Sequence, residues 1–189
     1  MRASHSLCAA ALAASALAAP VCAQETPSHV YVGAGAGRSD WHPGYAGCPS
    51  SGGCENTDTM VRAFAGYQIN GMFAAEAGFS NFGIIHDATS RIKAHAWEAT
   101  GLIAWPPDTA LSFYGKAGWF YSRAEGSGTL AGAKETNNGP TLGAGVQGQL
   151  TRRLDLRGEL QYYWKAIGGA TLPESGLTAV TVSALWRFH

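Results

Sequence analysis

The stretch LDLRGELQYYW, residues 154–164, decides the fold, because apolar and polar side chains alternate along it with a period of two. Leu154, Leu156 and Leu160 would share one face of an extended strand, with charged residues between them on the other face. Further segments of the chain alternate in the same way, and these are residues 29–39, 59–69, 72–82, 93–105, 110–123, 141–150 and 177–188. The pattern predicts eight β-strands and no helical domain.

The connections between these segments alternate in length. Asn70-Gly71, residues 106–109 and residues 151–153 form tight turns after the second, fourth and sixth segments. The other connections are polar and longer, from about ten to nineteen residues. Short turns at one end and long loops at the other are typical of barrels that cross an outer membrane, and strands in lipid must close because an open edge leaves N–H and C=O groups unpaired. We predict an all-β fold, an eight-stranded antiparallel up-and-down transmembrane β-barrel.

Alternation alone does not decide which face meets water. A soluble exported barrel that binds a small ligand would enclose Leu156, Leu160, Val180 and Val182 and expose the charged residues between them. The polar face is rich in Gly and Ala, which suits a crowded lumen better than a solvated surface. Aromatic residues gather near the segment ends, as interfacial girdles require. The membrane orientation is therefore favoured.

The N-terminus has the pattern of an export signal. Arg2 and His5 precede an apolar stretch at residues 7–19, and small residues end at Ala23. We predict a cleaved signal peptide at residues 1–23 and a barrel domain at residues 24–189. Lys+Arg and Asp+Glu both number 13, so no net charge favours nucleic acid as a partner.

Two cysteines remain after cleavage, Cys48 and Cys54, separated by turn-forming residues. In an exported chain we expect this pair to form a disulfide. It would close part of the connection at residues 40–58, which makes this loop the best candidate for contact with a host or matrix surface. No further Cys or His pattern completes a metal site, so we expect neither a metal nor a cofactor.

The polar face carries charges that would lie inside the barrel. Buried charges are costly unless they are paired, so we expect these residues to form an ion network that fills the lumen. A sharper hypothesis is a gate for a narrow, weak ion path, in which Glu76 exchanges between Lys116 and Arg157. A wide pore is excluded because eight strands leave an interior filled by side chains. The predicted lumen network consists of Arg62, Glu76, Glu98, Lys116, Arg157, Glu159 and Arg187.

An enzyme, such as one that modifies outer-membrane lipids, is the main alternative function. It would draw its nucleophile, base and orienting group from Ser80, Ser122, His86, His95 and Glu98. Neither G-x-S-x-G nor H-E-x-x-H is present, and we predict no enzymatic activity. The G-x-G-x-x-G at residues 143–148 lies within a strand, where close packing explains its glycines better than a nucleotide does.

Several short motifs recur in a characteristic order, and these are VYVGA (30–34), FAGYQ (64–68), AEAGF (75–79), GKAG (115–118), GAGV (143–146), LRGELQY (156–162) and WRF (186–188). Together they resemble the OmpA-type transmembrane domain and its small outer-membrane barrel relatives, over nearly all of the mature chain. The resemblance implies a Gram-negative outer membrane, periplasmic termini, and a structural or surface-interaction role.

The resemblance also implies partners. Outer-membrane lipid and lipopolysaccharide would surround the barrel, while periplasmic chaperones and the barrel-assembly machinery would insert it. Trp186 and Phe188 would belong to the C-terminal assembly signal, although His189 follows the phenylalanine here. Family members often carry a basic residue in the lumen of the first strand, where this chain has Gly35, and a glutamate in the sixth strand, where it has Gln147. A thinner lumen network is therefore expected.

Overall fold

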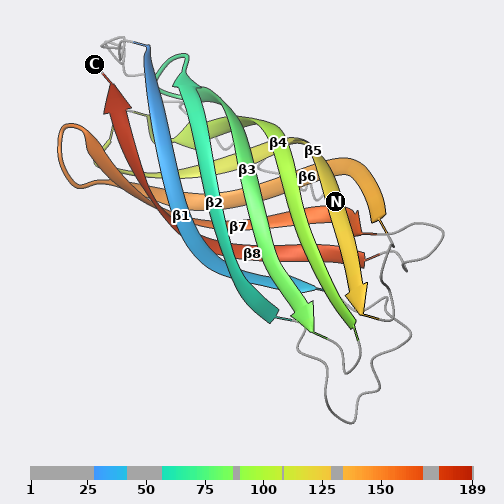
Figure 1. Cartoon of the computed structure of the whole chain (residues 1–189). Helices are drawn as coiled ribbons and strands as arrows, with labels where there is room; N and C mark the ends of the chain where they lie inside the picture. Colours follow the sequence, from blue (N-terminus) through green and yellow to red (C-terminus); the bar gives the residue numbers. More distant parts are fainter. Residues whose placement is uncertain are drawn as a thin grey trace, which may run out of the picture.

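A computed structural model describes residues 28–41, 57–86, 90–107, 109–128, 134–167 and 175–188. The chain folds into a closed barrel in which each strand pairs antiparallel with the next and β8 pairs with β1 (Figure 1). This confirms the predicted fold class. The described residues contain no α-helix with the length and apolar character of a membrane span. The strands are β1 (His29–Trp41), β2 (Thr57–Gln68), β3 (Phe73–His86), β4 (Ser90–Trp105), β5 (Leu111–Gly128), β6 (Lys134–Gln149), β7 (Leu154–Ile167) and β8 (Ser175–Phe188).

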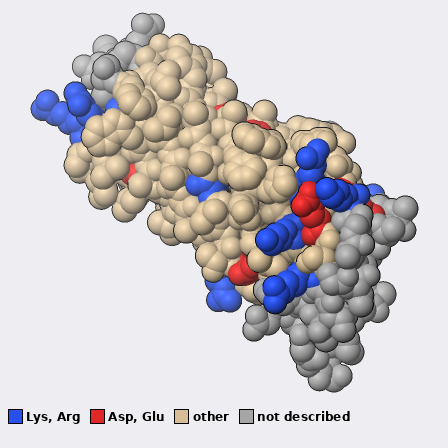
Figure 2. All heavy atoms as spheres, viewed as in Figure 1, with Lys and Arg blue, Asp and Glu red and all other residues tan. Residues whose placement is uncertain are grey.

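The apolar face of the barrel points outward. Leu160 and Val182 are 53% and 63% exposed, whereas Arg157 and Glu159 are 4% and 5% exposed. A soluble barrel would show the reverse, so the orientation predicted by that alternative is wrong. Figure 2 shows an outer surface that is largely free of charged side chains along its middle, with most Lys and Arg toward the two ends.

Large aromatic side chains lie on the outer face in two bands, one at the turn end and one near the middle of the long strands β4 and β5. In β4, Trp97 lies in the band nearer the loop end and Trp105 lies at the turn end, and both are exposed. Aromatic rings with polar edges settle where acyl chains meet headgroups, so these positions mark the borders of a hydrocarbon belt. The other exposed aromatics are Tyr67, Phe73, Phe113, Trp119, Tyr121, Trp164, Trp186 and Phe188.

The strands extend further at the loop end than the sequence pattern predicts. β5 continues past Arg123 to Gly128, and β6 begins at Lys134 instead of Thr141. Residues 87–89, 129–133 and 168–174 then connect the later strand pairs, so the expectation of ten or more residues in each of these loops is wrong. The apolar alternation stops where the hydrocarbon belt stops, but the backbone ladder continues because its N–H and C=O groups still pair. Fifteen residues, 42–56, separate β1 from β2, in agreement with the longer connection expected there.

The turn end is tightly built. Asn70 Oδ1 accepts hydrogen bonds from the backbone N–H groups of Met72 and Phe73 at 2.9 and 2.8 Å. Thr151 Oγ1 similarly accepts one from the N–H of Leu154 at 3.0 Å. These side-chain contacts fix the short connections that the sequence predicts.

Candidate functional site: the packed lumen

A layer of ion pairs fills the middle of the barrel. It consists of three cations and three carboxylates, Arg62, Lys116, Arg157, Glu76, Glu98 and Glu159, all of which are buried. Arg62 pairs with both Glu98 and Glu159, and Arg157 pairs with Glu76. Lys116 Nζ lies 3.1 Å from Glu159 Oε1 and 3.3 Å from Glu98 Oε1. The layer is therefore neutral as a whole.

Each carboxylate in this layer also accepts a hydrogen bond from a tyrosine hydroxyl. Tyr31 donates to Glu76 Oε1 at 2.8 Å. Tyr114 donates to Glu159 Oε2 at 2.6 Å, and Tyr163 donates to Glu98 Oε2 at 2.8 Å. Hydrogen bonds to the ionised form help compensate for the loss of water around a buried carboxylate. These tyrosines were not among the residues predicted for the lumen network, although each stands at an inward position of its strand.

Arg187 lies apart from the central layer. Its Nη2 is 2.7 Å from Oδ1 of Asp155, a residue that the predicted network did not include. Gln147 Nε2 donates to the other oxygen of this carboxylate at 2.7 Å, and Gln147 Oε1 accepts from Arg157 Nη2 at 2.8 Å. Gln147 thus joins a second ion pair, near the turn end, to the central layer.

Apolar clusters lie on both sides of the ionic layer. Toward the loops, Phe82 and Phe120 pack edge-on against Tyr163, with ring centroids 5.1 and 5.3 Å apart. These rings belong to a buried cluster that also contains Met60 and Leu177. Toward the turns, a second cluster consists of Tyr31, Phe64, Ala74, Leu102, Tyr114 and Leu185. The ionic layer is therefore covered by apolar rings on the loop side. On the turn side, apolar contacts share the lumen with the polar chain of Arg157, Gln147 and Asp155.

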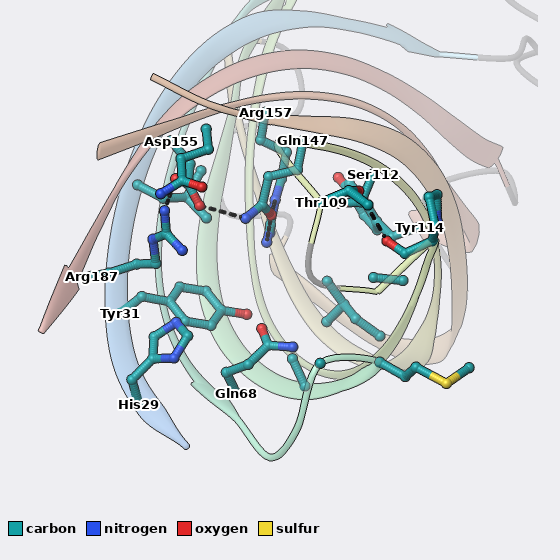
Figure 3. A pocket seen from close by; sticks show the side chains of 18 residues that line it. His29, Tyr31, Gln68, Thr109, Ser112, Tyr114, Gln147, Asp155, Arg157 and Arg187 are labelled. Atoms are coloured by element: carbon teal, nitrogen blue, oxygen red, sulfur yellow. Dashed lines mark hydrogen bonds and ion pairs between the residues drawn. The ribbon is translucent and has the colours of Figure 1, made fainter. Parts of the chain in front are cut away.

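A cavity of about 100 Å³ lies at the turn end (Figure 3). His29, Gln68, Ser112, Tyr114 and Arg157 are among the residues that line it. A space of this size, lined by both polar and apolar side chains, has room for a few water molecules. The cavity leads toward the ionic layer, where the buried side chains of Arg157 and its partners fill the cross-section of the lumen.

Glycine residues, which have no side chain, leave space for the lumen tyrosines. A Cβ at Gly66 would meet the ring of Tyr31, and a Cβ at Gly145 would meet the hydroxyl of Tyr114 at 2.6 Å. Gly145 belongs to the G-x-G-x-x-G stretch, so close packing accounts for that glycine. At Gly35 a Cβ would meet Ser183 Oγ and the backbone of Val182, so the barrel has no space there for a basic side chain.

The candidate catalytic side chains that the structure describes do not converge. Ser80, Ser122 and Glu98 are buried in the lumen, where Ser122 Oγ donates to the backbone oxygen of Ala166 at 2.6 Å. His95 instead lies on the outer face, with its ring 5.8 Å from that of Phe79. Within the described ranges, no group of His, Cys, Asp or Glu side chains could hold a metal ion. Cys48, Cys54, the side chain of His86 and the signal-peptide region lie outside the described residues.

The proposed assembly signal lies on the outer face of the closing strand. Trp186 and Phe188 are exposed, and they pair in register with Val32 and Val30 of β1. These side chains therefore stand at the seam where the first and last strands meet.

The comparisons with known proteins agree with this architecture. Residues 25–189 match the family model of the OmpA-like transmembrane domain. The chain belongs to this family. This OmpA-like barrel is 28% identical over 177 residues to outer membrane protein A of Klebsiella pneumoniae, a match that covers 84% of this chain and 50% of the relative. Its match to outer membrane protein A of Shigella flexneri is 28% identical over 173 residues and covers 84% and 48%. The chain thus spans about half the length of the curated relatives that it matches.

Solved structures share the fold of this OmpA-like barrel. Neisserial surface protein A superposes with a TM-score of 0.63 at 19% identity, over 86% of this chain and 99% of that protein. The attachment invasion locus protein Ail of Yersinia pestis gives a TM-score of 0.54 at 14% identity, over 85% and 97%. The N-terminal barrel of Pseudomonas aeruginosa OprF gives 0.57 at 12% identity, over 87% and 100%. Family and fold together place the protein in the outer membrane.

Proposed function

We propose that this OmpA-like barrel is a non-enzymatic structural protein of the outer membrane, with a lumen closed to solutes and a loop end that makes contacts at the cell surface. The layered lumen is the observation that carries the proposal. Its six central charges are compensated by one another and by tyrosine hydroxyls, and they lie between two apolar clusters. A side-chain plug of this kind stabilises a scaffold and leaves little space for a solute.

A gated ion path is the alternative to a closed lumen. Glu76 pairs with Arg157, and its Oε2 lies 3.9 Å from Lys116 Nζ, so an exchange of partners within the layer needs only a short movement. Such an exchange would still leave Phe82, Phe120 and Tyr163 across the loop side of the path. An ion that crosses this apolar layer loses its hydration without a replacement, which is costly. The apolar layer on the loop side therefore favours a lumen that is closed to ions over a gated path.

Conductance in planar bilayers tests the closed lumen. We expect no channel events from the native protein, nor from Glu76→Ala or Lys116→Ala variants that show heat-modifiable migration as evidence of folding. Adding Phe82→Ala and Phe120→Ala to the Glu76→Ala variant should admit ions, because it removes the rings that pack on Tyr163 as well as one carboxylate of the ionic layer. Steady channels in the native protein that change in the Glu76→Ala variant would support the gate and contradict closure.

The surface role rests on what the loop end presents. Short turns face the periplasm and loops face outward in barrels of this kind, so residues 42–56 and the projecting hairpins would be on the cell surface. Ail, which shares the fold, has been crystallised with the heparin analogue sucrose octasulfate. Deleting residues 48–54 should leave insertion intact and reduce binding to host cells or matrix. Unchanged binding would remove this loop from the proposal.

Further parts of the proposal concern export and chemistry. The signal peptide at residues 1–23, the Cys48–Cys54 disulfide and the recognition of Trp186 and Phe188 by the assembly machinery remain predictions from the sequence. The separation of His95 from Ser80 and Ser122 supports the absence of enzymatic activity. Esterase and lipid A deacylation assays on the refolded barrel should show no turnover.

A further inference from the structure

Cations follow the aromatic residues on the outer face of β4, β5 and β6 at the loop end. Beyond Trp97, β4 carries His95, Lys93 and Arg91 at successive outward positions. Beyond Tyr121, β5 carries Arg123 and then Glu125. Lys134 of β6 pairs in register with Glu125, which pairs in turn with Lys93. We call Arg91, Lys93, Arg123 and Lys134 the cation patch; Figure 2 shows Lys and Arg gathered at this end of the barrel.

The cation patch keeps a net positive charge. Among the residues named on these outward positions, Glu125 is the carboxylate, and it lies 3.7 Å from Lys134 Nζ with the two side chains 50% and 73% exposed. An exposed pair of this kind contributes little to stability and leaves Lys134 accessible to another anion. The backbone beneath the patch is paired throughout, because β4, β5 and β6 form a continuous ladder at this height.

A shallow groove of about 470 Å³ runs beside β6 on the outer face. The ladder between β6 and β7 stops at Thr141 and Tyr163, where β7 becomes irregular and Lys165 takes a φ of +52°. β6 nevertheless continues to Lys134, about 13 Å beyond Asn138 along the strand. The groove is lined mainly by apolar surface, from Asn138, Gly139, Pro140, Leu142, Trp164 and Lys165.

We infer that the cation patch binds the phosphorylated headgroup of an outer-leaflet glycolipid, with one of its acyl chains in the groove beside β6. The inference rests on the proposed orientation, in which the loop end faces outward. Lys93 lies four residues beyond Trp97, about 13 Å further along the strand than this aromatic border and at headgroup depth once the strand tilt is included. Arg and Lys bind phosphate through charge-assisted hydrogen bonds. A soluble sulfated glycan would use the charges but not the apolar groove, which favours a lipid with phosphates.

Binding of lipid A to the refolded barrel in zwitterionic micelles tests this inference. Each cation near an anionic lipid surface contributes ~1 kcal/mol, a factor of about five in affinity. The Lys93→Gln/Arg123→Gln variant should therefore bind bisphosphorylated lipid A roughly thirty-fold more weakly than the native protein. A charge-matched control, Arg152→Gln/Arg153→Gln, changes two exposed arginines at the turn end and should bind as the native protein does. Dephosphorylated lipid A should bind the native protein as weakly as the patch variant binds lipid A.

Several results would overturn the inference. The first is equal affinity of the patch variant and the control variant for lipid A. The second is equal affinity of the native protein for lipid A and for dephosphorylated lipid A, and the third is displacement of lipid A by inorganic pyrophosphate alone. Binding of sucrose octasulfate without binding of lipid A would assign the patch to a sulfated glycan instead. Heat-modifiable migration and insertion into phosphatidylcholine vesicles are measured for every variant. Loss of insertion in the native protein would contradict the proposed function, whereas intact insertion with unchanged lipid A binding would contradict only the inference.

Discussion

Replacing Arg62 with Met should destabilise the barrel strongly. Arg62 pairs with Glu98 and Glu159 and also donates to Gln161 Oε1 at 3.1 Å. Without it, two cations remain in the central layer against three carboxylates. Removing one partner from a buried ion network costs about 3–5 kcal/mol, because the charges left behind are desolvated without compensation. We expect a loss of this size in the free energy of unfolding.

A compensated variant separates the charge effect from the loss of packing. In Arg62→Met/Glu98→Gln, Lys116 and Arg157 face Glu76 and Glu159, so the layer is neutral again. This double variant should recover at least ~1 kcal/mol relative to Arg62→Met, since contacting charges couple in double-mutant cycles. Lys134→Met is the surface control, and the loss of its exposed pair with Glu125 should cost no more than about 1 kcal/mol.

Urea unfolding in phospholipid vesicles, followed by tryptophan fluorescence and by heat-modifiable migration, measures these free energies. The native protein and the three variants are compared at one lipid ratio and from both the folded and the unfolded side. If Arg62→Met loses less than ~1 kcal/mol and matches Lys134→Met, the central layer is solvated or rearranges freely. The reasoning from buried, mutually compensated charges would then be refuted.

Three further predictions address packing, orientation and oxidation. Gly118→Ala should lower the free energy of unfolding by about 1–3 kcal/mol, because the added Cβ would meet the backbone of Ala99 and Thr100. The control Gly101→Ala should be neutral, since its Cβ meets nothing within 4 Å, and equal effects of the two substitutions would contradict the packing. Val182→Arg, in the middle of the lipid-facing side of β8, should lower the free energy of unfolding in vesicles by about 2–4 kcal/mol. Thr136→Arg, on the projecting part of β6, should lower it by less than about 1 kcal/mol, and the reverse order would contradict the orientation. Cys48 and Cys54 of the exported protein should resist alkylation until a reductant is added, and immediate alkylation would contradict the disulfide.

The sequence contained enough information for the strand number, the connectivity and the orientation. Period-two alternation, as in residues 154–164, assigns each side chain to a face, and the tight turns at Asn70-Gly71 and residues 151–153 order the strands. The sequence pattern did not predict where β4, β5 and β6 end on the loop side. Past Arg123 the outward residues become polar, so the apolar pattern ends while the backbone pairing persists. Hydrophobic periodicity reports the membrane border and not the end of the strand.

The lumen contacts were less accessible than the strands, for a geometric reason. Alternation places Arg62, Tyr114 and Glu159 inside the barrel, but it does not give their heights along the axis. Those heights depend on the stagger between neighbouring strands, which accumulates around the barrel until β8 meets β1.

Arg62 and Glu159 show the consequence. They are 97 positions apart in the chain and on non-neighbouring strands, yet the completed register brings them into contact. A slip of one residue in any strand pair would send the inward residues of that strand to the lipid side. The tyrosines and glutamates of the lumen therefore add a second constraint on register, because any slip would transfer charges into hydrocarbon and leave their partners unpaired. On this argument the ionic layer contributes to the specificity of the fold as well as to its stability.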